Sequence, residues 1–161
     1  MEHAGSMFWA ARAMRQHMTA YGSTREDFGR VAVDNRTNAA GNPQAVFRTP
    51  ITIGDYLASP AIDAPMHLLD MDAPVDGALA VAVTTVERAR DLPHRPVSID
   101  SFASALLCHN DGLYWPEADA IAARRAVGNL FGHTDLQPAD MDIAYPYDGF
   151  TILAMRTPSS A

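Results

Sequence analysis

The chain has 161 residues, of which 48% are apolar and 19% charged, and its formal net charge is −7 at pH 7. This length and composition are typical of one globular domain with a buried core, which excludes a disordered tail and a fibrous protein. The negative charge argues against a general affinity for nucleic acid, because binding to phosphates depends on clustered cations.

Signals for export or membrane insertion are not found in the sequence. No apolar run approaches the roughly 20 residues that span a bilayer, and the first residues lack a basic stretch followed by an apolar one. The single cysteine, Cys108, excludes an internal disulfide framework and fits a reducing compartment. We therefore expect a cytoplasmic protein without a membrane span.

Two amphipathic helices are predicted in the first 40 residues. Apolar residues recur every three or four positions up to Gly22, a residue typical of a left-handed helix end. Ser23 and Thr24 can each cap a second helix, since an acid follows each of them three positions later; that helix is predicted over residues 25–39. The stripe of the first helix is Met7, Ala11, Met14, Met18 and Tyr21, and the inward residues of the second are Phe28, Val31 and Ala32.

Residues 42–75 hold five of the eleven prolines, with aspartate and serine between short apolar pieces. This pattern predicts an irregular but ordered excursion with short helices, over residues 52–57 and 67–70. His67 has no partner at the spacing of metal ligands, so a surface or capping role is favoured over ligation.

Three apolar runs predict β-strands, over residues 78–83, 96–100 and 141–145. The first is almost continuously apolar, which is typical of a strand covered on both faces in a layered α/β protein. Helices are predicted over residues 84–90 and 116–132, where acids lie in the first turn. These features favour a layered α/β fold.

The last predicted strand leads into Tyr147 and Asp148, which Gly149 and a helix-compatible segment follow. A strand that ends at polar residues and turns at glycine into a helix holds those side chains firmly at the crevice above a sheet. The structural alternative is that Tyr147 is half-buried with a bonded hydroxyl group, and that Asp148 caps the following helix. Residue types alone favour this alternative.

Cys108 and His109 are the other pair that could combine a thiol with a base. Adjacent residues of a strand point to opposite faces, and a helix separates adjacent residues by about 100°. Their adjacency therefore argues against a nucleophile and base that act together.

Four stretches, in this order, resemble the thiolase superfamily and, within it, the sterol-carrier or lipid-transfer branch. The resemblance implies an α/β layered fold of two similar halves, normally dimeric, that acts on acyl-coenzyme A thioesters. It covers most of the chain and rests on the order of the four stretches, since each alone is a weak motif. They are AMRQHMTAYGSTREDF at residues 13–28, DGALAVAVTTVERA at 76–89, LQPADMDIA at 136–144 and YDGFT at 147–151.

The resemblance also divides the chain into three regions of a partial thiolase-like layered fold. Residues 1–75 resemble the loop domain, which is helical and irregular. Residues 76–95 resemble the last strand and helix of the N-terminal half. Residues 96–161 resemble the start of the C-terminal half.

Tyr147 carries the chemistry that the resemblance implies. Thiolases have Asn-Glu or His-Asp ahead of a small residue and phenylalanine, where this chain has Tyr147, Asp148, Gly149 and Phe150. A tyrosine here resembles thiolase-like lipid-transfer proteins that act as aldolases on steroid side-chain thioesters. In such chemistry Tyr147 would exchange a proton with the β-hydroxyl or carbonyl group during retro-aldol cleavage, and Asp148 would orient backbone or substrate.

Other parts of a thiolase site have no counterpart in this chain. A thiolase's nucleophilic cysteine lies before the matched region, and its Gly-His-Pro motif and second cysteine lie after it; Cys108 matches neither cysteine. The first hypothesis is therefore that the chain is part of a lipid-transfer-type thiolase homologue, which cleaves a carbon–carbon bond or transfers an acyl group, and that the chain is inactive alone. The second is a non-catalytic thiolase-like module that binds a lipid or a partner.

The resemblance also implies the ligands and partners. An acyl-coenzyme A thioester or a lipid is expected as the substrate, with no permanently bound cofactor and no metal. Homo- or hetero-oligomers are expected through thiolase-like dimerisation, because unpaired sheet edges and uncovered helix stripes favour association.

Overall fold

The structure is a computed structural model that describes residues 3–105 and 116–155. The Cys108–His109 pair lies outside the described residues. The elements, in chain order, are α1 (His3–Tyr21), α2 (Arg25–Ala40), α3 (Ile53–Ala58), β1 (Ala61–Asp63), β2 (Met66–His67), the 3₁₀ turn η1 (Leu68–Asp70), α4 (Val86–Arg90), α5 (Pro116–Gly132), the 3₁₀ turn η2 (Pro138–Asp140) and α6 (Thr151–Met155).

Helices α1 and α2 form where the sequence predicts them. Gly22 follows α1 with φ of +69°, a left-handed conformation that glycine adopts without strain. At the start of α2 the Asp27 carboxylate accepts a hydrogen bond of 2.8 Å from the backbone N–H of Thr24, which is half of a capping box. Of the two possible caps, the structure therefore uses Thr24.

The predicted stripe of α1 packs on the core except at its C-terminal end. Met14 has no exposed surface, and Met7 and Met18 pack against the core. Tyr21 was expected in the stripe, but its side chain is 75% exposed because the last turn of α1 extends beyond the core. Its ring packs against His17 instead, with ring centroids 4.7 Å apart.

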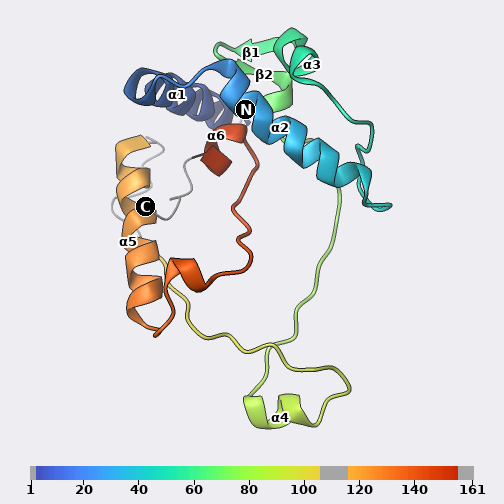
Figure 1. Ribbon diagram of the computed structural model, residues 1–161, viewed down its shortest axis with the longest axis vertical. Coiled ribbons are helices and arrows are strands. Elements are labelled where there is room, and N and C mark those ends of the chain that lie inside the picture. Colours follow the sequence, from blue (N-terminus) through green and yellow to red (C-terminus); the bar gives the residue numbers. More distant parts are fainter. Residues whose placement is uncertain (1–2, 106–115, 156–161) are drawn as a thin grey trace.

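The core lies between α1, α2, α3, the β1–β2 hairpin and α6, which gather in the upper part of Figure 1. Tyr56 of α3 lies directly on α2 at Gly29, where a Cβ atom would come within 2.6 Å of ring carbon Cδ1. Ile152 of α6 brings the C-terminal part of the chain into the same core. The buried apolar residues are Trp9, Ala10, Ala11, Ala13, Met14, Phe28, Tyr56, Met66 and Ile152.

The proline-rich region is ordered, as the sequence predicts. Thr52 caps α3 through a capping box with Asp55, and β1 and β2 form an antiparallel hairpin in which Ala61 lies opposite His67. His67 occupies the N-terminal cap position of η1, and its backbone N–H donates to Asp70 at 2.7 Å. Short helical turns therefore occur at both places where the sequence predicts them.

The prediction of three strands from the apolar pattern is wrong for this structure. Residues 78–83, 96–100 and 141–145 form neither strand nor helix, and their large apolar side chains are exposed to solvent. Leu79 and Val97 are each 93% exposed. The apolar pattern identifies a segment that can become a strand, but a strand also needs a neighbour to satisfy its N–H and C=O groups. The described part of the chain supplies no such neighbour to these segments.

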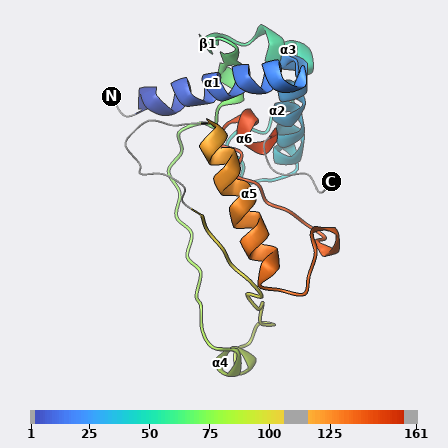
Figure 2. The same ribbon diagram turned by 90° about the vertical axis from the view of Figure 1, so that its left-hand side faces the viewer.

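The remaining helices agree with the sequence. Thr85 caps α4 and accepts a hydrogen bond from the backbone N–H of Arg88 at 3.4 Å. Helix α4 lies at the far end of a long excursion, which both Figure 1 and Figure 2 show. The Ser101 hydroxyl group donates a 2.7 Å hydrogen bond to the Leu130 carbonyl group near the end of α5. Among the described helices, none combines the length and apolar character needed to cross a bilayer.

Candidate functional site

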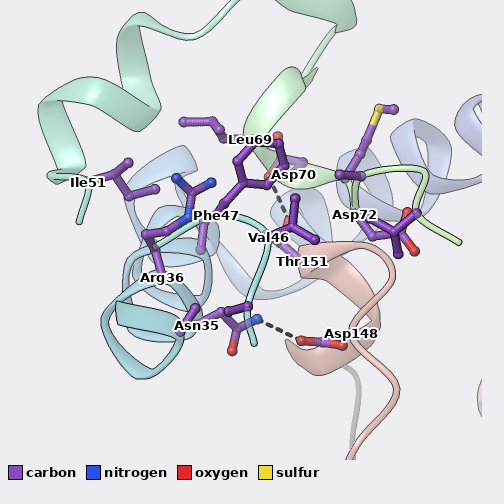
Figure 3. Close-up of a pocket in the computed structure, with 16 residues that line it drawn as sticks. Asn35, Arg36, Val46, Phe47, Ile51, Leu69, Asp70, Asp72, Asp148 and Thr151 are labelled. Atoms are coloured by element: carbon purple, nitrogen blue, oxygen red, sulfur yellow. Dashed lines mark hydrogen bonds between the residues drawn. The ribbon is translucent and has the colours of Figure 1, made fainter. Parts of the chain in front are cut away.

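The turn that carries Tyr147 and Asp148 is attached to the other end of the sequence. Asn35 of α2 donates a hydrogen bond of 2.8 Å from Nδ2 to Oδ2 of Asp148, as Figure 3 shows. The backbone N–H of Asp72 donates a 3.1 Å bond to the carbonyl oxygen of Gly149. This turn is therefore held at two points by residues of the first 75 positions, through the Asp148 side chain and through the Gly149 backbone.

Asp70 lies at the centre of these contacts and is only 2% exposed. Its Oδ1 atom accepts hydrogen bonds of 2.6 Å from the hydroxyl groups of Tyr56 and Thr151. Its Oδ2 atom accepts a 2.7 Å bond from the backbone N–H of His67. Three donors thus satisfy a buried carboxyl group, which would otherwise be costly to remove from water.

Tyr56 is held as a donor in this cluster. Burial, and then the hydrogen bond to Asp70, raise the pKa of the Tyr56 hydroxyl group well above its ordinary value. Tyr56 therefore stays protonated across the physiological range. Its role here is to orient Asp70 rather than to exchange protons with a substrate.

Tyr147 is not half-buried, as the structural alternative supposed: its side chain is 72% exposed. Its ring folds back over Gly149, where a Cβ atom would overlap the hydroxyl group and come within 2.5 Å of Cζ. Gly149 therefore allows the tyrosine to lie close against its own backbone. Asp148 bonds to a side chain of α2, which differs from the expected bond to the first turn of the following helix.

A pocket of about 300 Å³ lies beside this turn, between α2, the segment around Phe47 and the chain after η1. Its wall is mainly apolar. Arg36 lies in the wall with its guanidinium 5.2 Å from the centre of the Phe47 ring and bonds to the Thr49 carbonyl oxygen at 3.3 Å. Asp148 lines the pocket, whereas Tyr147 lies outside its lining. The polar lining residues are Asn35, Arg36, Asp70, Asp72, Asp148 and Thr151.

The sequence pattern indicated Tyr147 and Asp148 as candidate site residues but did not indicate the residues that hold the turn. Asn35 carries no local signal, because it lies on the exposed side of α2 and meets Asp148 across 113 positions. Asp70 had a partial signal as the acid of the predicted short helix over 67–70. Within the ranges described, no group of three histidine, cysteine, aspartate or glutamate residues is placed to hold a metal ion.

The chain is similar to two curated lyases over most of its length. It is 43% identical over 152 residues to a protein of Thermomonospora curvata named steroid side-chain-cleaving aldolase, covering 91% of this chain and 39% of that protein. It is 42% identical over 148 residues to the 17-hydroxy-3-oxo-4-pregnene-20-carboxyl-CoA lyase of Mycobacterium tuberculosis, covering 88% and 38%. The chain thus spans about two fifths of the length of these relatives.

A solved structure described as the Ltp2-ChsH2(DUF35) aldolase matches the same region with a TM-score of 0.83. The match has 39% sequence identity and covers 92% of this chain and 40% of that one. No protein-family model matches the chain. The structural match confirms the α/β, thiolase-like fold class. The matched region is thus thiolase-like, and its similarity to steroid side-chain-cleaving aldolases confirms the resemblance to the lipid-transfer-protein-like branch.

Proposed function

We propose that this chain supplies the acid–base residue of a thiolase-like lyase that cleaves a carbon–carbon bond in a hydroxyacyl-coenzyme A thioester with a steroid-type side chain. The names of the two curated relatives support the reaction and the substrate class. The observation that carries the proposal is the anchored turn. Asp148 is bonded to Asn35 at the edge of the apolar pocket, and Tyr147 stands beside it.

The proposed reaction is a retro-aldol cleavage. A base removes the proton of the β-hydroxyl group, the bond between the α and β carbons breaks, and its electron pair enters the thioester as an enolate. The former β carbon becomes a ketone, and a proton returned to the α carbon completes the acyl product. The Tyr147 hydroxyl group would exchange the proton at the β-oxygen, while Asp148 holds the turn through Asn35.

We also propose that the chain is inactive by itself. A site for acid–base chemistry excludes water, so that its hydrogen bonds are strong and its intermediate is protected. Tyr147 is 72% exposed, and the segment over 141–145 that precedes it also has its large apolar side chains exposed. We infer that further polypeptide covers this face and completes the site, in an assembly of like or unlike subunits.

The three regions predicted from the sequence are part of the proposal. Residues 1–75 would act as a loop domain that carries Asn35 and Asp70. Residues 76–95 would supply the last strand and helix of one thiolase half, and residues 96–161 the start of the other half. The exposed segments over 78–83 and 141–145 would then become strands when their sheet neighbours are present.

The alternative is a non-catalytic module that binds a lipid or a partner. The pocket of about 300 Å³ favours this alternative, because its wall is mainly apolar and it reaches Asp148 without including Tyr147. The two proposals differ in whether the Tyr147 hydroxyl group matters. Binding by the module would survive its loss, whereas turnover by the lyase would not.

The test measures ketone and shortened acyl-coenzyme A released from a 17-hydroxysteroid side-chain thioester. The chain is assayed alone and together with candidate partner subunits. We expect turnover only with a partner, and its loss by roughly 10² or more in Tyr147→Phe. Tyr145→Phe, two positions earlier and 91% exposed, is the matched control and should keep full activity. Lipid binding without turnover beside any partner would support the module instead.

A further inference from the structure

We propose that Asp70 is a positioning residue of the candidate site, which fixes the Tyr147–Gly149 turn by holding the hydroxyl group of Thr151. The inference rests on the proposed function for its catalytic consequence. Its structural part, that this one bond sets the position of the turn, stands on the contacts of the described residues.

Residues 70–72 and 149–151 lie antiparallel, with three consecutive ties between them. The Thr151 hydroxyl group donates to Asp70 at 2.6 Å, Met71 forms a β-bridge with Phe150, and the Asp72 N–H donates to the Gly149 carbonyl at 3.1 Å. Asp70 and Thr151 are 81 positions apart in the sequence. The register of these ties, rather than chain continuity, therefore decides where the turn lies.

Among the three ties, the one at Asp70 is buried at both ends. Asp70 is 2% exposed and Thr151 is 5% exposed, so water cannot replace the hydrogen bond between them at low cost. Tyr56 and the backbone of His67 fix the orientation of the carboxyl group from the side of the loop region. Thr151 is its donor from the other side.

The register matters for the proposed chemistry because it sets the position of Tyr147. Tyr147 lies two residues before Gly149, and its ring packs on the Gly149 backbone. A shift of the 149–151 segment would carry the tyrosine hydroxyl group with it. An acid–base group must stay within hydrogen-bond reach of its proton, and a displacement of about 1 Å can cost roughly 10² in rate.

The test compares two isosteric variants that each remove one donor from the same oxygen of Asp70. Thr151→Val removes the donor on α6, and Tyr56→Phe removes the donor on α3. Hydrogen exchange of the amides in residues 147–152 is measured by mass spectrometry on the full chain. We expect exchange about tenfold faster in Thr151→Val and a clearly smaller increase in Tyr56→Phe, because the His67 N–H still holds the Asp70 carboxyl group and Thr151 still donates to it. Thr151→Ser, which keeps the hydroxyl group, should restore slow exchange.

Two results would overturn the inference: an unchanged exchange rate in Thr151→Val, or an equal acceleration of the turn in Tyr56→Phe. If Thr151→Val does not fold, Thr151→Ala replaces it and is compared with Thr151→Ser in the same way. In the active assembly we also expect Thr151→Val to lower kcat with little change in KM. Absence of turnover in the parent protein would refute the proposed function, while the exchange rates would still decide the structural part.

Discussion

Asn35 and Asp148 are joined by a hydrogen bond of 2.8 Å across 113 positions of sequence. Asn35 belongs to the second helix of the chain, and Asp148 to the turn that carries Tyr147. The bond, together with the burial of Ile152, makes α2 the support on which the turn rests.

The first prediction concerns the charge at position 35. Asn35→Ala removes one exposed hydrogen bond and should lower the free energy of unfolding by roughly 1 kcal/mol or less. Asn35→Asp places a second carboxylate opposite Asp148 and should lower it further. Urea unfolding in low salt and in 1 M NaCl measures both variants. Because salt screens exposed charges, the difference between them should shrink in 1 M NaCl; a difference that salt does not change would contradict the electrostatic explanation.

The second prediction concerns the contact between α2 and α3. Gly29→Ala places a methyl group 2.6 Å from Cδ1 and 3.0 Å from Cε1 of the Tyr56 ring, so the ring or the helix must move. We expect a loss of about 1–3 kcal/mol in the free energy of unfolding, as for other overpacked cores. Gly128→Ala on α5 is the matched control, because its new methyl group meets nothing within 4 Å. It should raise helix stability by about 0.5–1 kcal/mol, and a loss equal to that of Gly29→Ala would refute the packing argument.

Local sequence patterns predict the helices because the backbone hydrogen bonds of a helix form between residues that are close in the sequence. The Thr24–Asp27 capping box and the left-handed Gly22 are both written in a few adjacent residues. The three predicted strands differ, since the hydrogen bonds of a strand depend on a second segment. Val81 and Ile143 have the right residue type, yet they are 78% and 68% exposed. The apolar pattern alone does not show whether a neighbouring strand is available for pairing.

The candidate site shows the same difference between local and long-range contacts. Tyr147, Asp148 and Gly149 stand out because they follow a predicted strand end, and this is a local signal. Asp70 and Asn35 meet the turn only after the chain has folded, across 81 and 113 positions. A buried carboxyl group with donors from three elements has no signature in sequence spacing.

The third prediction concerns acid. Hydrogen bonds from the Thr24 backbone and side chain lower the pKa of Asp27, and bonds from the Thr52 side chain and backbone lower the pKa of Asp55. A carboxyl group with a lower pKa in the folded state stabilises the fold above its unfolded pKa, and this contribution is lost as the pH falls through the folded value. Stability should therefore begin to fall below about pH 5 and keep falling until the pH lies below the lowered pKa values of the folded state.

The variants Asp27→Asn and Asp55→Asn test this pH dependence. Together they should lower stability more at pH 7 than at pH 3, since asparagine can accept the same bonds without a charge. Urea midpoints at the two pH values measure the effect. Asp76→Asn, at an exposed residue of the extended segment, should leave the slope unchanged. A slope that persists in the double variant would show that other carboxyl groups carry it.

The fourth prediction concerns the uncovered segments over 78–83 and 141–145. Extended backbone with exposed apolar side chains pairs readily with another chain, so we expect the isolated chain to self-associate at micromolar concentration in light scattering. Val81→Lys and Ile143→Lys place charges at positions that are already exposed. They should therefore reduce association without lowering the thermal midpoint. Val46→Lys, at an exposed position in the wall of the pocket, is the control and should not reduce it. A parent chain that stays monomeric when concentrated would show that this face needs no cover, and would refute the proposal that further polypeptide completes the site.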